Sequence, residues 1–98
     1  MAQDALTDDV KSYLNITWSD DDTDARVARI IANMRPYVAD LIGTSGAAAF
    51  DKPGLDQSLF FAACFYEWNS ARDELLVNYA DDIRAARIAH EVEHAKQV

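Results

Sequence analysis

Residues 59–68, LFFAACFYEW, decide the fold of this chain, because a helix built from them is apolar on every side. Such a helix is stable in water only when neighbouring elements cover it, each with an apolar stripe of its own. We therefore predict that this stretch forms the central helix of the core. It holds half of the aromatic side chains of the protein, which can bury the largest apolar areas: Phe60, Phe61, Phe65, Tyr66 and Trp68.

The chain before residue 20 predicts a short helix followed by an extended link. Thr7 can cap a helix that starts after it, with Asp8 and Asp9 placed favourably against the positive end of the helix dipole. The link has β-branched and aromatic residues without helical spacing. The residues expected to be buried are Val10, Tyr13 and Leu14 of the helix and Ile16 and Trp18 of the link.

A longer helix follows, with apolar residues at the three-and-four spacing of one helical face. Ser19 or Asp20 can cap it, and Gly43 suits the left-handed residue that ends a helix. Pro36 removes a backbone donor and clashes with the carbonyl four residues back, so we expect a kink or a break near residues 33–35, which would give two helices in place of one. The residues expected to face the core are Val27, Ile30, Ile31, Met34, Val38, Leu41 and Ile42.

Glycine and proline mark residues 43–55 as a loop, with Phe50 as its expected anchor in the core. Asp56 can cap the central helix that follows. From residue 55 onward the chain lacks both Gly and Pro, so we expect helix with one turn near Asn78.

A polar last helix is expected over residues 79–96, with Asn78 as its cap and Asp81 and Asp82 in its first turn. The whole pattern predicts an all-α fold, a small bundle of about four helices around a central aromatic helix. The length suits a single helical domain over residues 1–98.

Acidic residues outnumber basic ones by 17 to 9, which gives a net charge of −8. This charge repels phosphate backbones, so sequence-specific DNA binding is disfavoured. The single cysteine, Cys64, lies inside the apolar stretch, where we expect a buried, inert thiol in a reducing cytoplasm. The first residues lack the features of a signal peptide, and no apolar run approaches the ~20 residues of a bilayer span, so we expect a soluble protein.

The segment His90–His94, HEVEH, matches the H-E-x-x-H pattern in which two histidines bind zinc and the glutamate, here Glu91, acts as general base. A catalytic zinc needs a third protein ligand, and only four residues follow. Helical spacing also places His90 and His94 with Ile83 and Arg87 on a mainly polar face. We therefore predict no metal, cofactor or catalytic residue, and keep a zinc hydrolase as an alternative. The apolar stripe expected to face the core is Ala85, Ile88, Ala89, Val92 and Ala95.

Two further patterns favour structural interpretations. Asp20, Asp22 and Asp24 match the opening of an EF-hand loop, but Ala25 and Ile31 stand where that loop needs Gly and a bidentate Glu. A charged helix start explains the acids better. The aromatic residues Phe61, Phe65 and Trp68 lack nearby polar groups of the kind a small-molecule pocket needs, so we assign them to packing.

Residues 65–88, FYEWNSARDELLVNYADDIRAARI, resemble the C-terminal half of the head–tail connector proteins of long-tailed phages, the small head-completion adaptors of siphophages and prophages. Residues 6–31, LTDDVKSYLNITWSDDDTDARVARII, are similar to the N-terminal half of that family, whose first helix is followed by an isoleucine and an acidic run. The elements also come in the family's order. The resemblance covers nearly the whole chain outside residues 44–54.

The resemblance implies a virion assembly protein without enzymatic activity. Subunits would form a homo-oligomeric, dodecamer-like ring between the portal protein and the tail or stopper proteins, in the bacterial cytoplasm during assembly and then in the virion. Packaged DNA would pass through the ring without specific binding. The acidic charge suits such a channel, because it repels phosphates. Besides the zinc hydrolase, a small helical regulator or antitoxin acting through protein contacts remains as an alternative.

Overall fold

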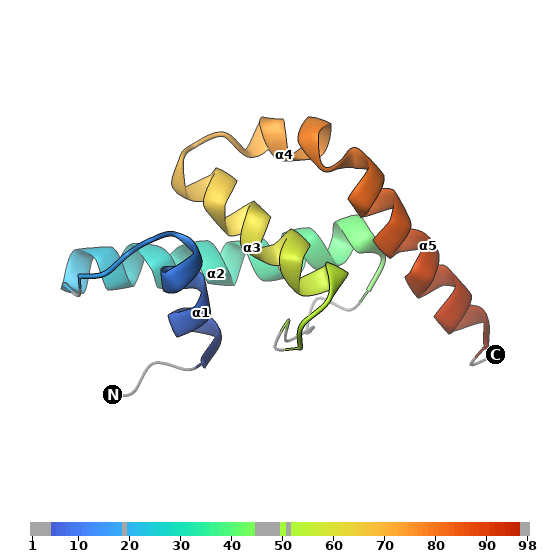
Figure 1. Cartoon of the computed structure of the whole chain (residues 1–98), viewed down its shortest axis with the longest axis horizontal. Coiled ribbons are helices and arrows are strands. Elements are labelled where there is room, and N and C mark those ends of the chain that lie inside the picture. Colours follow the sequence, from blue (N-terminus) through green and yellow to red (C-terminus); the bar gives the residue numbers. More distant parts are fainter. Residues whose placement is uncertain (1–4, 19, 45–49, 51, 97–98) are drawn as a thin grey trace.

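A computed structural model describes residues 5–18, 20–44, 50 and 52–96. This part of the chain is all-α, as predicted, and has five helices where about four were expected. α2 is the longest, and α3 packs against each of the other four helices. Figure 1 shows α1 and α3 crossing α2, with α4 leading into α5. The helices are α1 (Ala5–Tyr13), α2 (Asp21–Ile42), α3 (Leu55–Trp68), α4 (Arg72–Asn78) and α5 (Ala80–Lys96).

α2 forms one side of the core. Asp20 caps it, and Gly43 ends it in the left-handed conformation at φ 79°, both as predicted; Ser19, the other expected cap, lies outside the described residues. The helix continues through Pro36, so the expected break is wrong. Pro36 is exposed, and water can therefore satisfy the carbonyl that loses its helical partner. Of the seven core residues predicted here, all are buried except Leu41, which is partly buried.

α1 begins at Ala5, so Thr7 lies within the helix rather than before it. Val10, Leu14 and Ile16 are buried, as expected. Tyr13 and Trp18 are 44% and 50% exposed, and their predicted burial is wrong.

The turn after α1 explains where the residues of the link lie. Asn15 takes a positive φ of 61°, and the Ile16 amide donates to the Lys11 carbonyl at 2.9 Å, the six-residue closure of a Schellman motif. This turn directs Ile16 into the core and carries the chain outward, so Trp18 reaches the surface.

α3 buries one side and leaves part of the other open. Phe60 is fully buried and stacks on Phe50 with ring centroids 4.8 Å apart, so the predicted anchor of the loop is confirmed; residues 45–49 and 51 lie outside the described part. Phe65 is 42% exposed, and three other aromatic residues are partly buried: Phe61, Tyr66 and Trp68. The stretch is therefore less completely covered than its composition predicts.

The first turn of α3 also differs from the prediction. Gly54 occupies the cap position without a side-chain hydrogen bond, and Asp56 lies inside the helix. Its carboxylate faces α5 instead.

Residues 69–71 form a turn that the sequence pattern does not predict. Ser70 takes a positive φ of 56°, and the Ala71 amide donates to the Tyr66 carbonyl at 2.7 Å, again as in a Schellman motif. Serine is an unusual residue at this position, which normally favours glycine, so its sequence signal is weak.

Two arginines hold this turn against α2. The Arg26 guanidinium lies 4.1 Å from the Trp68 ring centroid and donates to the Trp68 carbonyl at 2.7 Å. Arg72 lies over the Tyr37 ring at 4.9 Å and pairs with Glu67. The contacts of Arg26 and Arg72 stabilise the residues at both ends of the turn.

The predicted turn near Asn78 is confirmed, but Asn78 ends α4 rather than capping α5. Its amide donates to the Tyr66 hydroxyl at 3.0 Å. Asp81 and Asp82 lie in the first turn of α5, as expected.

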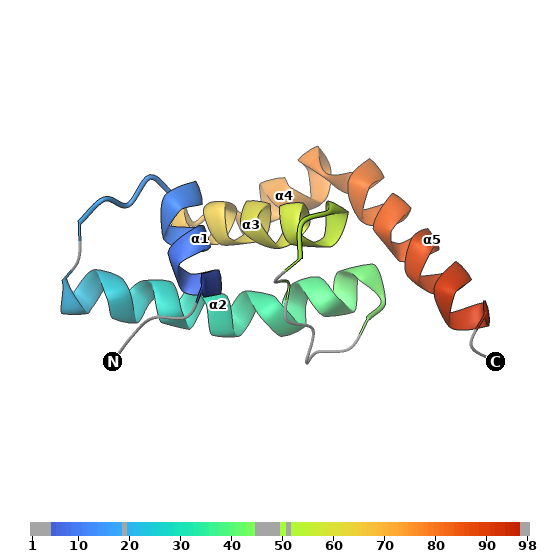
Figure 2. The same ribbon diagram turned by 60° about the horizontal axis from the view of Figure 1, so that its bottom comes forward.

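The molecule is elongated, with principal extents of 46 × 30 × 18 Å. Figure 2 shows the C-terminal turns of α5 running past the end of α2, at the opposite end of the long axis from the N-terminus of α2. Among the described helices, none combines the length and the apolar character needed to cross a membrane.

Replacing Phe60 tests the assignment of the core. Phe60→Ala should lower the free energy of unfolding by about 3–5 kcal/mol, because it removes a fully buried ring and leaves a cavity. Phe65→Ala, on the same helix but 42% exposed, is the matched control and should cost clearly less. Urea denaturation followed by circular dichroism measures both, and equal losses would contradict the burial described above.

Candidate interaction surfaces

α5 presents an apolar stripe to solvent. Its inward side consists of Ile83, Ala86 and His90, which are partly or fully buried. The five residues expected to face the core are all exposed, with Ile88 and Val92 at 52% and 50%, so that prediction is wrong in direction. This exposed set is named the α5 stripe: Ala85, Ile88, Ala89, Val92 and Ala95.

The rotation of α5 has a local cause. Ala86 is 1% exposed, and its small side chain lets the helix approach the core closely. Ile83 packs on the core one turn earlier, and His90 contacts Asp56 one turn later. These three contacts fix one side of the helix inward, so the α5 stripe points away from it.

Five aromatic residues from α1, α3 and the α4–α5 junction form a second, partly exposed group, the aromatic cluster. The Tyr13 ring lies 5.6 Å from Phe61 and 6.3 Å from Phe65, measured between centroids. Phe65 meets Tyr66 edge-on at 5.7 Å, and Tyr66 meets Tyr79 at 6.0 Å. The half-exposed members, Tyr13 and Phe65, offer aromatic surface of the kind enriched at protein interfaces.

The Tyr13 phenol titrates above its ordinary range. Burial is the main cause of the raised pKa, and the neighbouring phenols of Tyr79 and Tyr66 add to it. Tyr13 therefore stays neutral at physiological pH, which suits a residue whose half-exposed ring lies against other aromatic rings.

Of the HEVEH segment, the structure describes the side chains of His90 and Glu91 but not that of His94. His90 is partly buried, and its Nε2 lies 2.8 Å from the Oδ2 of Asp56. Glu91 is exposed and lies 3.9 Å from Arg87, measured from Oε1 to Nε. His94 belongs to α5, but its side chain lies outside the described part of the chain. Among the described residues, no group of three His, Cys, Asp or Glu side chains could hold a metal ion.

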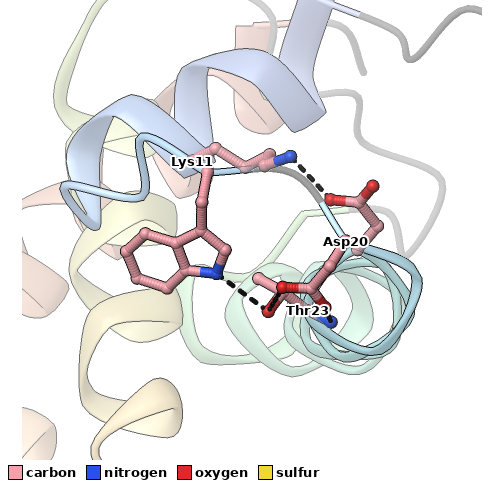
Figure 3. A network of polar contacts seen from close by, with 5 residues as sticks. Lys11, Asp20 and Thr23 are labelled. Atoms are coloured by element: carbon pink, nitrogen blue, oxygen red, sulfur yellow. Dashed lines mark hydrogen bonds and ion pairs between the residues drawn. The ribbon is translucent and has the colours of Figure 1, made fainter.

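The N-terminus of α2 carries the polar network drawn in Figure 3. Asp20 accepts from the Thr23 amide at 2.7 Å and from the Thr23 hydroxyl at 2.9 Å, while the Trp18 indole donates to the same hydroxyl at 3.0 Å. The Lys11 ammonium, on a largely buried side chain, lies 2.6 Å from Asp24. The acids of this segment therefore cap a helix and join α1 to α2.

Cys64 is fully buried in α3, and burial raises the pKa of its thiol to about 12. The expectation of a buried thiol is confirmed. A thiol with this pKa is a poor nucleophile, since the reactive form is the thiolate.

Sequence patterns named the residues of both surfaces except Tyr79, but not their roles. The α5 stripe was expected inside, and the two tyrosines at the ends of the cluster, Tyr13 and Tyr79, carried no signal as a group because they are far apart in sequence. The one sequence signal for the aromatic cluster is that tyrosines stand at helix ends on both sides of the aromatic helix.

Comparison of this chain with known protein families, with curated proteins and with solved structures finds no match.

Removing the cap of α2 should destabilise the protein at neutral pH. The hydrogen bonds from Thr23 lower the pKa of Asp20, so the folded state favours the ionised carboxylate. This stabilisation is present above the pKa of the unfolded chain and is lost as pH falls through the lower, folded pKa.

The thermal midpoint of Asp20→Ala should therefore lie below that of the wild type at pH 7, and the difference should shrink in acid. Asp21→Ala, which removes an acid of the same helical turn but not the cap, is the control. A difference that stays constant from pH 7 to pH 2 would contradict the capping role.

We expect no stoichiometric zinc, because a catalytic zinc needs a third protein ligand that the HEVEH segment does not supply, and Glu91 is exposed beside Arg87. Elemental analysis of untagged protein, dialysed after incubation with zinc, measures the content. One tightly held zinc per chain, lost in His90→Ala and in His94→Ala, would reverse this prediction.

Proposed function

We propose that this chain is a subunit of the ring that connects the head of a long-tailed phage or prophage to its tail. The similarity of residues 6–31 and 65–88 to the head–tail connector family suggests the role. The observation that carries it in the structure is the α5 stripe, an apolar helix face turned to solvent at the end of an elongated molecule.

An exposed apolar stripe suits a protein that works in an assembly. Ile88 and Val92 lie one turn apart, so their side chains form one continuous patch on α5. Contiguous apolar surface on a small protein marks a place where another protein binds. A ring subunit has such a place by necessity, because each copy must bury part of its surface against the next.

The charge of the chain suits a channel for DNA. A net charge of −8 gives the ring an acidic wall, which repels the phosphate backbone and lets DNA pass without sticking. The exposed acids at the start of α2 lie at the opposite end of the molecule from the last turns of α5 (Figure 2). Further exposed acids, Glu91 and Glu93, lie on α5 itself.

In this proposal the protein needs no cofactor and has no catalytic residue. Its partners are further copies of itself, a portal protein and tail or stopper proteins, with DNA passing through. The dodecamer-like ring assembles in the bacterial cytoplasm and persists in the virion.

Assembly should depend on salt. Closing a ring from chains of charge −8 accumulates repulsion, and the screening length falls from about 10 Å at 0.1 M salt to about 3 Å at 1 M. We expect a monomer or small oligomer at low salt, and closed rings either at high salt and high protein concentration or on a template such as the portal protein. Light scattering after size exclusion gives the mass, and negative-stain microscopy shows whether the particles are closed.

Two outcomes would count against this function. A mass that falls as salt rises would mean that ion pairs hold the assembly together. The proposed acidic channel would then be wrong. A protein that stays monomeric under every condition would favour a small helical regulator, which binds a partner through the same surfaces without closing a ring.

A further inference from the structure

We propose that the α5 stripe of one copy docks on the aromatic cluster of the next copy, so that these two surfaces form the repeating contact of the assembly. This inference rests on the proposed ring. It assigns the contact to named residues on both sides, and it makes the contact heterologous, with a different surface from each partner.

The two surfaces lie on separate parts of one subunit. The half-exposed rings of the cluster come from α1 and α3, and the stripe lies on the side of α5 turned away from the core. α1 and α5 do not contact each other among the described residues, and both views show the last turns of α5 far from α1 (Figures 1 and 2). A subunit can therefore bind one neighbour with each surface at the same time, which a ring requires.

The shapes and chemistry of the two surfaces are complementary. Ile88 and Val92 are branched side chains that project from one side of α5, and alanines flank them on the same side. Tyr13 and Phe65 meet edge-on and offer two half-exposed rings to a branched side chain. Rigid aromatic rings bury large areas at low entropic cost, as the residues that dominate interface energies do.

Charge favours this pairing over stripe against stripe. Arg84 lies one turn before Ile88 on the same side of α5, is exposed and has no ion pair among the described residues. Asp9 lies one turn before Tyr13 on α1 and is exposed. Docking the stripe on the cluster so that Arg84 meets Asp9 pairs opposite charges at the edge of the contact, although Asp81, one turn before Ala85 on the same side of α5, is also exposed. Pairing two stripes across a two-fold axis would instead give an isologous contact, which closes at a dimer.

Mixing two variants tests the heterologous contact. The double variant Ile88→Asp/Val92→Asp loses the stripe and keeps the cluster. Tyr13→Ala/Phe65→Ala loses the cluster and keeps the stripe. Each should stay monomeric under conditions in which the wild type assembles, while an equimolar mixture should give a species of twice the chain mass and nothing larger, because one good contact remains. Light scattering after size exclusion measures the masses, and circular dichroism checks that each variant is folded.

Val77→Asp is the matched control. Val77 is 77% exposed on α4 and belongs to neither surface, so this variant should assemble like the wild type. Charge reversal gives a test that leaves the apolar residues intact. Arg84→Asp alone and Asp9→Arg alone should weaken assembly at the lowest salt that supports it, and the double variant Arg84→Asp/Asp9→Arg should recover it.

The outcomes separate this contact from the proposed function. Wild-type rings that persist in the stripe and cluster variants would overturn the contact and leave the ring intact. Variants that are monomeric alone and fail to associate on mixing would also overturn it. Dimers formed by the cluster variant alone would show stripe-to-stripe pairing instead. A wild type that forms no closed particles at any salt would overturn the ring, and the contact with it.

Discussion

The packing of α3 on α2 is the contact on which the rest of the structure depends. Phe60, stacked on Phe50, is fully buried between the two helices, and Ala62 and Ala63 beside it allow close approach. The later helices bury much less. Among the described hydrophobic residues, α4 buries Leu75 and α5 buries Ala86. Because α4 and α5 bury so few hydrophobic residues, their stability depends on their contacts with the α2–α3 pair. α5 can therefore expose an apolar side without destabilising the fold.

The core could be predicted from sequence wherever the spacing of apolar residues agrees with the residues that mark helix ends. On α2 the apolar spacing agrees with the ends marked by Asp20 and Gly43, and the helix has those ends, although Pro36 inside it predicts a kink or a break. The turn at residues 69–71 was missed because Ser70 takes a left-handed conformation that serine rarely adopts. Its stability comes from Arg26 and Arg72, which reach it from α2 and α4. Such tertiary contacts leave no periodic trace in the sequence.

The surfaces were harder to predict than the core, and α5 shows why. Hydrophobic periodicity identifies an apolar stripe but not the partner that covers it. On α5 the less apolar face turns inward. Ala86 permits close packing there, and His90 contacts Asp56 of α3. The stripe built around Ile88 is more apolar and yet lies outside. In the proposed assembly, this apolar side of α5 would face the neighbour rather than its own core.

If the proposed ring forms, the aromatic cluster also bears on when the chain becomes competent to assemble. Its rings come from residue 13 near the start of the chain, from the middle of α3, and from Tyr79 just before the last helix. During synthesis this surface is completed only after Tyr79 has left the ribosome, by which time α1, α2 and α3 have emerged to form the core. A growing chain therefore cannot present a finished cluster to finished copies around it. In the proposed ring, the order of synthesis would itself delay association until each subunit is folded.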